Sequence, residues 1–282
     1  MILVFGSSGQ VATELRERLP DAMFLGRAQA DLSKPSDIVR TIAEIRPEAI
    51  INAAAYTAVD KAEEEEALAL KINADAPRMM AQAAASLDIP LVHISTDYVF
   101  DGSGEEPFPT DAETAPLGAY GRTKLAGEAA IAAIAPTCAI LRTSWVFSPH
   151  GANFLKTMLR LSETRDRLTI VADQVGGPTP ASAIAAACVK IAGLLKDDPS
   201  KAGTFHFSGA PDVSWADFAR EIFRQAGRPV SVEDIPTSAY PTPARRPLNS
   251  RLDCRSLSAV GLDRPDWKAG VAETLAKLGV TA

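Results

Sequence analysis

Short runs of apolar residues alternate with longer amphipathic stretches through the first half of this chain. Runs with few polar positions are typical of strands buried on both faces of a sheet, and we expect strands at residues 2–5, 22–25, 49–52, 90–95 and 138–142. Helices are expected at residues 13–19, 36–45 and around 120–124, and a long alanine-rich helix is expected to begin in the acidic segment 60–66. Strands that alternate with helices predict an α/β protein with a doubly wound parallel sheet and right-handed crossovers.

The pattern changes after about residue 150. Short strands are expected at residues 168–171 and 203–207, with an alanine-rich helix at about 181–195 between them and a last helix at 267–278. The segment 236–247 holds too many prolines for regular structure. The second part of the chain is therefore expected to form a smaller α/β region beside the main sheet.

A glycine-rich turn follows the first predicted strand. The sequence Gly6-Ser7-Ser8-Gly9-Gln10-Val11-Ala12 leads directly into a predicted helix. Glycines allow the backbone to come close to a ligand, and the N-terminus of a helix offers free N–H groups to a phosphate. A plain connection between a strand and a helix is the alternative, but the position after the first strand favours dinucleotide binding. Ala12 stands at the third small position of the usual fingerprint, where we expect it to be tolerated.

The end of the second predicted strand carries Gly26-Arg27 and no acidic residue that would bind the ribose hydroxyls of NAD. An arginine at this position can bind the 2′-phosphate of NADPH. An arginine on the solvated surface would give the same pattern, and the sequence does not separate the two readings. We expect NADPH as the cofactor, with NADH possible.

Tyr120 and Lys124 lie four residues apart in a predicted helix, so their side chains share one face. A nearby ammonium favours the phenolate, and we expect Lys124 to lower the pKa of Tyr120 towards neutral pH. A phenol tuned in this way can exchange a proton with an alcohol or a carbonyl group. Taken alone, the same spacing also occurs by chance on exposed helices.

Composition excludes several classes of function. The net charge of −6 gives no basic surface for nucleic acid, and no apolar run is long enough for a membrane helix. The three cysteines are far apart and odd in number, which argues against a disulfide framework and favours a reducing cytoplasm. The three histidines form no metal-ligand pair at helical spacing, and no metal site is expected.

Together these motifs resemble the extended short-chain dehydrogenase/reductase family, and within it the reductases of dTDP-linked 4-keto-6-deoxysugars. The resemblance runs from Met1 to about Leu278 and rests on the order and spacing of the glycine loop 6–12 and of the segments 52–63, 95–100, 120–128, 142–146, 173–179 and 245–250. It implies a Rossmann-type NAD(P)-binding domain at residues 1–150, with contributions from about 177–200. Residues 151–282 would then be mainly a substrate-binding region.

The resemblance also implies a reaction, in which NAD(P)H reduces the C4 carbonyl of dTDP-4-dehydro-6-deoxy-L-mannose to give dTDP-L-rhamnose. Tyr120 would donate the proton, Lys124 would hold the nicotinamide ribose, and Thr96 would hydrogen-bond the developing oxyanion. The cofactor would be lined by Gly6, Gly9, Gln10, Val11, Arg27, Asp31, Leu32, Ala54, Ala55 and Tyr56, together with Tyr120 and Lys124. The substrate would meet Thr96, Asp97, Tyr120, Trp145, Arg246 and Asn249.

One departure from the family concerns assembly. Some members form dimers through a magnesium ion that glutamates from both subunits hold. Glu14 is present at the first matching position, but Ser182 and Lys277 stand where carboxylates would be needed. Magnesium prefers oxygen ligands and would not accept an ammonium group. We therefore expect a monomer or a metal-free homodimer.

Two other functions remain open at this stage. The first is another nucleotide-sugar oxidoreductase or epimerase of the same fold that acts on a different 4-keto sugar. The second is a non-catalytic NADP-binding subunit that regulates a partner. Such a subunit would be free to lose its acid–cation pair, whereas Thr96, Tyr120 and Lys124 are all present here.

Overall fold

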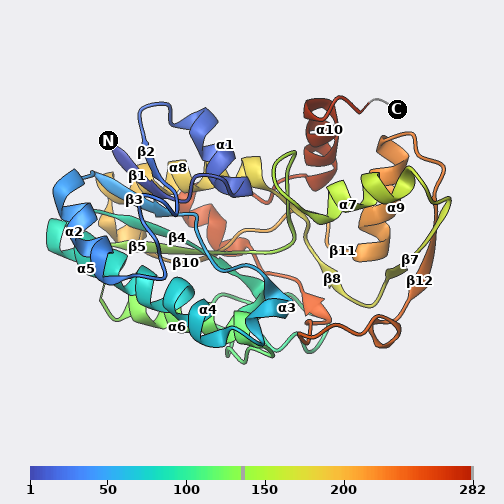
Figure 1. Cartoon of the computed structure of the whole chain (residues 1–282), viewed down its shortest axis with the longest axis horizontal. Coiled ribbons are helices and arrows are strands. Elements are labelled where there is room, and N and C mark those ends of the chain that lie inside the picture. The colour runs from blue at the N-terminus through green and yellow to red at the C-terminus, as the bar shows by residue number, and fades with distance from the viewer. Residues whose placement is uncertain (135–136, 281–282) are drawn as a thin grey trace.

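The computed structural model describes residues 1–134 and 137–280 and is built around one parallel sheet (Figure 1). The strand order is β10-β5-β4-β3-β1-β2, and every neighbouring pair is parallel. The strands are β1 (Ile2–Phe5), β2 (Met23–Leu25), β3 (Ala49–Asn52), β4 (Leu91–Thr96), β5 (Cys138–Thr143) and β10 (Gly203–His206). The predicted doubly wound α/β fold is confirmed.

Helices cover both faces of this sheet (Figure 1). One face carries α1 (Gln10–Arg18) and α8 (Ala181–Asp197), and the other carries α2 (Ser36–Ile45), α5 (Ala76–Leu87) and α6 (Ala119–Ala132). Within β1, Val4 packs with α1 and α8, while Leu3 and Phe5 pack with α2 and α5. Because alternate side chains point to opposite faces, a strand covered on both sides must be apolar throughout. This explains why the apolar runs located the strands so well.

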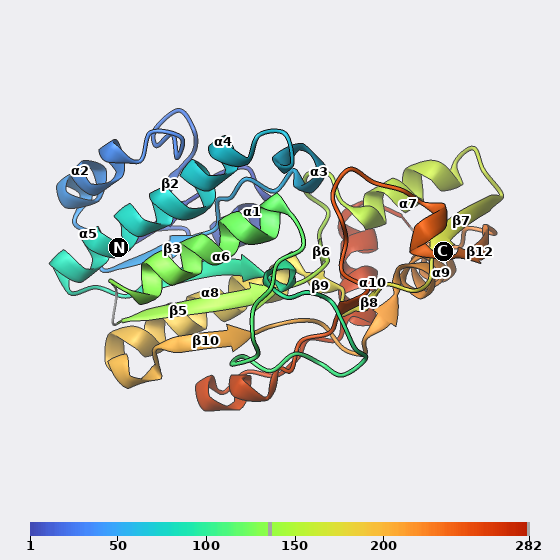
Figure 2. The ribbon, with the colours of Figure 1, turned by 90° about the horizontal axis from the view of Figure 1, so that it is seen from below.

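The second region lies beyond the carboxyl ends of these strands (Figure 2). Its core brings together Phe147, Leu155, Leu168, Phe218 and Trp267. The elements around that core are α7 (Phe154–Ser162), α9 (Trp215–Gln225), α10 (Trp267–Lys277) and the parallel pair β7 (Arg167–Val171) and β12 (Ser231–Ile235). The short strands β8 (Val175–Gly176), β11 (Val213–Ser214) and β13 (Asn249–Ser250) form a small sheet, and β6 (Val146–Phe147) pairs with β9 (Thr179–Pro180).

The single long helix expected after the acidic segment is wrong. The chain forms α3 (Val59–Ala62), α4 (Glu66–Leu70), a π-helical turn at Lys71–Asp75 and then α5. Pro77 lies in the first turn of α5 and lacks an N–H group, so regular helical hydrogen bonding cannot pass through it. The wider π turn accommodates this break and directs Asn73 into the protein.

Other predicted bounds shift by a few residues. Helix α1 begins at Gln10 and not at residue 13, because Gly9 already serves as its N-cap. The segment 236–247 contains only a short turn at Thr237–Ala239, as its prolines predict. The stretch 177–200 was expected to contribute to the first domain, and strand β10, which follows it, also joins the main sheet. Over the part of the chain that the structure describes, no helix has the length and apolarity that crossing a membrane requires.

Candidate active site

A cavity of about 960 Å³ opens at the carboxyl ends of the strands, beside the second region. Parallel α/β sheets bind ligands at this edge. The predicted site residues that line it are Gly6, Gly9, Gln10, Val11, Arg27, Asp31, Leu32, Ala54, Ala55, Tyr56, Thr96, Asp97, Tyr120, Lys124, Trp145 and Arg246. The fold thus brings into one cavity all the predicted residues except Asn249.

The glycine loop has the geometry of a dinucleotide cradle. Gly6 adopts a φ of +111°, and a Cβ there would lie 3.3 Å from the backbone carbon of Ala53. Gly9 faces open space on the cavity side, where a Cβ would meet no atom within 4 Å. No side chain caps α1, so its first N–H groups are available to a phosphate. These residues therefore fit a dinucleotide.

The Gln10 side chain does not simply line the cofactor space. Its Oε1 accepts hydrogen bonds from Ser148 Oγ at 2.8 Å and from Asn153 Nδ2 at 2.9 Å. Its Nε2 donates to the carbonyl oxygen of Val146 at 3.3 Å. Gln10 therefore ties the first turn of α1 to the segment 146–153, which forms part of the opposite cavity wall.

Arg27 lies at the rim of the cavity and is 85% exposed. Its Nε is 3.8 Å from Asp31 Oδ1, which is a weak contact. The Ser33 hydroxyl and backbone N–H bind Asp31 and lower the pKa of its carboxyl group. The guanidinium is therefore free to turn towards a ligand phosphate.

Helix α6 carries the phenol and the ammonium. Its start is fixed by Glu63, whose Oε1 accepts the Ala119 N–H at 2.8 Å. A Cβ at Gly121 would lie 2.2 Å from the Tyr98 carbonyl oxygen, so only glycine allows the helix to approach this closely. The Tyr98 ring meets the Tyr120 ring edge-on, with centroids 5.4 Å apart. These contacts hold the Tyr120 ring in place.

The expected lowering of the Tyr120 pKa is not found. Burial raises the pKa of the phenol, and the negative charge of Asp97 adds to the shift, while a hydrogen bond with Thr96 opposes it. The Lys124 ammonium does not exert the predicted effect, because it is engaged elsewhere: its Nζ donates to Ile94 O at 2.7 Å and lies 3.2 Å from His93 Nε2. Burial lowers the pKa of Lys124 itself to about 8, against an opposing effect of Glu128.

Thr96 and Asp97 form a buried polar pair at the end of β4. Thr96 Oγ1 donates to Asp97 Oδ1 at 3.0 Å and accepts the Tyr98 N–H at 3.2 Å. Asp97 Oδ2 is buried without a hydrogen-bond partner among the described residues. Burial raises the pKa of Asp97 to about 6, although hydrogen bonds with Ser250 and Thr96 oppose the shift. The sequence marked Asp97 as a substrate contact but did not reveal its unsatisfied oxygen.

Trp145 lies in the cavity wall in a strained conformation, with a φ of +49°. Its ring stacks on Trp215, with centroids 3.6 Å apart and planes 12° apart. Trp215 Nε1 in turn donates to Gln174 Oε1 at 3.2 Å. Trp215 also lines the cavity, and the sequence reading did not find it. A tryptophan at the start of an amphipathic helix could have signalled it, but its pairing with Trp145 spans 70 residues.

Arg246 reaches the cavity from the proline-rich segment. Its Nη2 lies 2.8 Å from Asp60 Oδ2, and Asp60 Oδ1 also accepts the Ala244 N–H at 3.1 Å. Asp60 therefore docks this segment onto α3 and holds the guanidinium at the cavity edge.

Asn249, the other predicted diphosphate contact, does not reach the cavity. Its amide donates to the carbonyl oxygens of Ser103 and Glu106, and its Oδ1 accepts from Arg251. The side chain is buried and fixes the loop around residues 101–106. The side-chain polar atoms of Asn249 thus have partners within the fold, and its contact with the substrate stays a prediction.

Glu14, the carboxylate that was matched to the magnesium position, lies in a separate cluster. Glu14, Glu17 and His150 bring their ligand atoms within 4.8 Å of one another. Lys277 Nζ lies 3.5 Å from Glu14 Oε2 and 3.0 Å from Glu17 Oε2. A cation of the chain itself is therefore already paired with both carboxylates.

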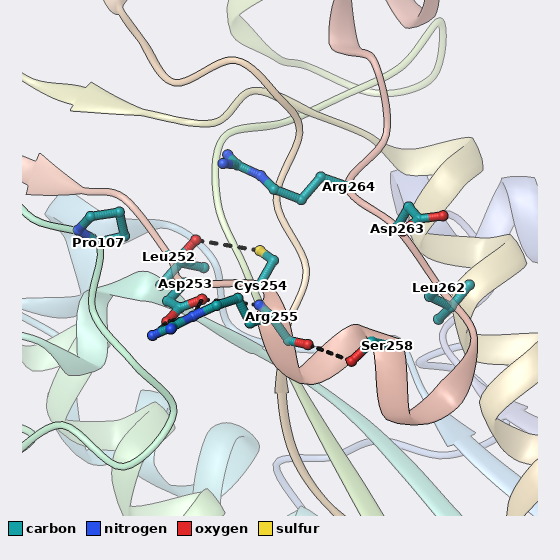
Figure 3. A pocket seen from close by; sticks show the side chains of 9 residues that line it. All are labelled: Pro107, Leu252, Asp253, Cys254, Arg255, Ser258, Leu262, Asp263 and Arg264. Atoms are coloured by element: carbon teal, nitrogen blue, oxygen red, sulfur yellow. Dashed lines mark hydrogen bonds and ion pairs between the residues drawn. The ribbon is translucent and has the colours of Figure 1, made fainter.

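A second cavity of about 510 Å³ is lined by Pro107 and by residues of the segment 252–264 (Figure 3). Arg264 at its wall is paired with Asp212 at 2.5 Å, and Arg255 is paired with Asp253 at 2.5 Å. Neither arginine is left to bind an anionic ligand, so we assign no function to this cavity.

Comparisons with known proteins identify the family of this chain. A family model described as the RmlD substrate binding domain matches residues 1–280. A curated dTDP-4-dehydrorhamnose reductase of Sinorhizobium fredii is 45% identical over 277 residues, which cover 95% of this chain and 94% of that protein.

Two solved structures have the same fold along nearly the whole chain. A dTDP-4-dehydrorhamnose reductase from Clostridium acetobutylicum is 39% identical, covers 99% of each chain and has a TM-score of 0.92. One from Bacillus anthracis, solved in complex with NADP, is 35% identical, covers 98% of each chain and has a TM-score of 0.92. This chain therefore belongs to the family that the RmlD substrate binding domain defines.

Proposed function

We propose that this protein reduces the C4 carbonyl of dTDP-4-dehydro-6-deoxy-L-mannose (dTDP-4-dehydrorhamnose) with NADPH and so forms dTDP-L-rhamnose. The observation that carries the proposal is a single cavity that holds a dinucleotide cradle, the pair Tyr120 and Lys124, and Trp145. Relatives that match this chain almost end to end carry the name of that reductase. The protein is thus an oxidoreductase of dTDP-rhamnose biosynthesis that acts on a nucleotide sugar.

NADPH is the proposed cofactor because a relative of the same length was solved with NADP. The N–H groups at the start of α1 would meet its pyrophosphate. The exposed guanidinium of Arg27 would meet its 2′-phosphate, and this contact would favour NADPH over NADH. NADH would still bind, since the cradle itself does not depend on that phosphate.

The bound nicotinamide supplies the hydride. Tyr120 gives its phenolic proton to the sugar oxygen as negative charge grows there. A proton donor must be protonated before the reaction, and the raised pKa of the buried phenol ensures this at neutral pH. Thr96, which lies beside the phenol, would turn its hydroxyl hydrogen from Asp97 to the same oxygen and stabilise it. Lys124 would hold the ribose hydroxyls of the cofactor.

The remaining contacts of the sugar nucleotide would come mainly from the second part of the chain. Residues 1–150, with α8 and β10, form the sheet and its cover, and we assign the cofactor to them. We assign substrate binding mainly to residues 151–282. Trp145, supported by Trp215, would pack against the sugar ring, and Arg246 would face the diphosphate.

We also propose that the protein works as a monomer or as a homodimer that needs no metal. The carboxylates of Glu14 and Glu17 are paired with Lys277, and a magnesium ion would have to displace that ammonium. A partner of another kind, such as nucleic acid, is not expected from the net charge of −6.

A reducing cytoplasm is the proposed compartment. Cys138, Cys188 and Cys254 are free thiols and buried. Burial raises the pKa of Cys138 and of Cys188 to about 12, so neither is a reactive thiolate.

The test is NADPH oxidation with dTDP-4-dehydrorhamnose, made in place by its upstream enzymes, followed through the absorbance of the reduced nicotinamide. We expect loss of absorbance matched by formation of dTDP-L-rhamnose. A panel of other nucleotide-linked 4-keto sugars serves as the comparison. A higher kcat/KM with one of them would assign the protein to that sugar. NADPH binding without turnover on any sugar would support a regulatory subunit instead.

A further inference from the structure

A line of three buried polar side chains runs behind the proposed active site. It begins with Asn52 at the end of β3, continues through His93 on β4 and ends at Lys124 on α6. Asn52 Nδ2 lies 3.0 Å from His93 Nδ1, and His93 Nε2 lies 3.2 Å from Lys124 Nζ. The three residues are 1%, 0% and 1% exposed, so water cannot replace any of these contacts.

The backbone fixes the direction of the Asn52 amide. The Ala54 N–H donates to Asn52 Oδ1 at 3.2 Å. If the amide were flipped, its NH₂ group would face that N–H, donor against donor. The NH₂ group must therefore point at His93 Nδ1. Since this group donates, Nδ1 must be the acceptor and carries no proton. A neutral imidazole carries one proton, so the proton of His93 lies on Nε2.

This tautomer creates a conflict at Lys124. The Nε2–H of His93 points at Lys124 Nζ, and an ammonium group there has only donors to offer. The neutral amine removes the conflict, because its lone pair accepts from Nε2–H while one of its own hydrogens binds Ile94 O at 2.7 Å. The imidazole cannot resolve the conflict by becoming charged, since burial and the Lys124 charge hold the pKa of His93 well below its usual value.

Other groups around Lys124 do not reverse this preference. Glu128 faces it from its own helix and His93 faces it from β4. Glu128 is the only one of these whose charge favours the ammonium of Lys124, and its carboxylate is engaged by Arg142 Nη2 at 2.7 Å and by Ser95.

We propose that Asn52 and His93 are positioning residues that set the charge of Lys124, by holding the imidazole in its Nε2–H tautomer and so favouring the neutral amine. The proposal rests on the proposed function only in giving Lys124 a part in the reaction. The hydrogen bonds between Asn52, His93 and Lys124 do not depend on which reaction the protein catalyses.

The line acts as a fixed electrostatic device and not as a proton wire. A wire would need Asn52 to take up a proton at one end and release it at the other, and a carboxamide does not do this near neutral pH. The lowered pKa of Lys124, at about 8, agrees with such a device. Near neutral pH the amine is then populated beside the ammonium, and the group can accept from as well as donate to a ribose hydroxyl.

The direct test is the tautomer of His93 in the protein without ligands. The chain has three histidines, so a nitrogen-15 histidine-labelled sample gives a spectrum that can be assigned with the variants His93→Gln, His150→Gln and His206→Gln. Long-range proton–nitrogen correlations distinguish the two neutral tautomers. We expect the Nε2–H form for His93 at about pH 7. Finding the Nδ1–H form, or a charged imidazole, would overturn the proposal.

The second test replaces Asn52 by Leu, which keeps the volume and removes the NH₂ donor. His93 can then adopt the Nδ1–H form and accept from the Lys124 ammonium. We expect the tautomer of His93 to change. We also expect the midpoint of the kcat/KM pH profile that reports on Lys124 to rise by about one pH unit, because one hydrogen bond contributes about 1 kcal/mol, which is close to one pKa unit. An unchanged tautomer in a folded Asn52→Leu variant would refute the mechanism.

Asn73→Leu is the matched control. Asn73 is an equally buried amide that binds Tyr56 and Thr123 and does not touch His93. We expect its replacement to leave the His93 tautomer unchanged. If either variant fails to fold, the spectrum of the unaltered protein still decides the question. Because the His93 tautomer is measured without a sugar substrate, failure of the proposed reaction would affect only the kcat/KM profile and not the tautomer result.

Discussion

The chemistry of the proposed site depends on burial more than on the pairing of charges. The sequence suggested that Lys124 lowers the pKa of Tyr120, but the structure removes both groups from water and turns the ammonium towards β4. The phenol is therefore held in the form that can give a proton, which suits a reductase. Burial of Tyr120 therefore keeps on the phenol the proton that the reduction needs.

Tyr120→Phe removes only the hydroxyl group from a packed ring. We expect kcat to fall by roughly 10²–10⁴, the usual effect of losing a general acid, and NADPH to bind nearly as before. Turnover and cofactor fluorescence measure the two effects. Tyr98→Phe is the control, because its ring packs edge-on against Tyr120 but is assigned no proton transfer. Equal losses in the two variants would show that packing, and not the Tyr120 proton, limits the reaction.

Asp97 predicts a pH dependence of stability. The pKa of its carboxyl group is about 6 in the folded protein, against 3.8 for an aspartate that nothing perturbs. Because the folded state holds this proton more tightly, its contribution is full below the unfolded pKa and is lost as pH rises through about 6. In Asp97→Asn, the free energy of unfolding should gain about 2 kcal/mol at pH ~7 relative to pH ~4, compared with the unaltered protein.

Denaturant unfolding between about pH 4 and pH 7 measures this change. Asp101→Asn is the matched control, because hydrogen bonds from Ser103 lower the pKa of Asp101. Replacing Asp101 should change the pH dependence of the free energy of unfolding slightly, and in the direction opposite to that of Asp97→Asn. A parallel change in both variants would contradict the account of Asp97.

At the scale of elements, the cavity is held together by side chains that cross between them. Gln10 joins α1 to the segment 146–153, and Asp60 joins α3 to the proline-rich segment. The acidic stretch 60–66 thus does more than begin a helix, since Glu63 also fixes the start of α6.

Gln10→Ala should loosen the wall of the cofactor space. Three hydrogen bonds are lost, each worth about 0.5–1.5 kcal/mol, and part of this loss should appear as a roughly tenfold rise in the KM for NADPH. The control is Gln225→Ala. The Gln225 amide donates to Glu221 on its own helix, α9, and to the Lys268 carbonyl oxygen on α10, away from the cavity. The account fails if Gln10→Ala leaves the KM for NADPH at the control value.

The sequence predicted the elements whose pattern is local. The strands β1 and β3 and the helix α2 were located at their observed bounds, because burial on one or both faces leaves a clear apolar pattern. The π turn at Lys71–Asp75 and the helices α7 and α9 were missed. The π turn depends on Pro77 and on the hydrogen bonds of Asn73 to Tyr56 and Thr123. The apolar pattern of the segment does not indicate these partners.

The same limit applies to the site. Motif spacing located Tyr120, Lys124 and the glycine loop, whose relations are local. It could not reveal that Trp215 supports Trp145 or that His93 opposes the ammonium of Lys124, because these contacts join distant segments. It could not reveal either that the Asn249 amide binds the distant loop around residues 103–106.

At the scale of the whole molecule, the question is what the surface around Glu14 binds. His150 and Lys277 bring α1, the loop after β6 and α10 together at this point. The Lys277 ammonium is paired with this carboxylate within one chain, and the assembly should therefore be independent of divalent cations.

Light scattering after size exclusion tests this independence. We expect the same molecular mass with magnesium and with EDTA. In Lys277→Glu, a third carboxylate replaces the ammonium beside Glu14, Glu17 and His150, and a response to magnesium should appear. A dimer of the unaltered protein that dissociates in EDTA would contradict the prediction.

The most direct test of the central claim follows the hydride itself. The protein is incubated with dTDP-4-dehydrorhamnose and NADPH that carries deuterium at the transferable C4 position, and the product is analysed by NMR and mass spectrometry. The account predicts dTDP-L-rhamnose with one deuterium bonded to C4 of the sugar. A product without that label, or label retained in the cofactor while the sugar stays oxidised, would contradict it.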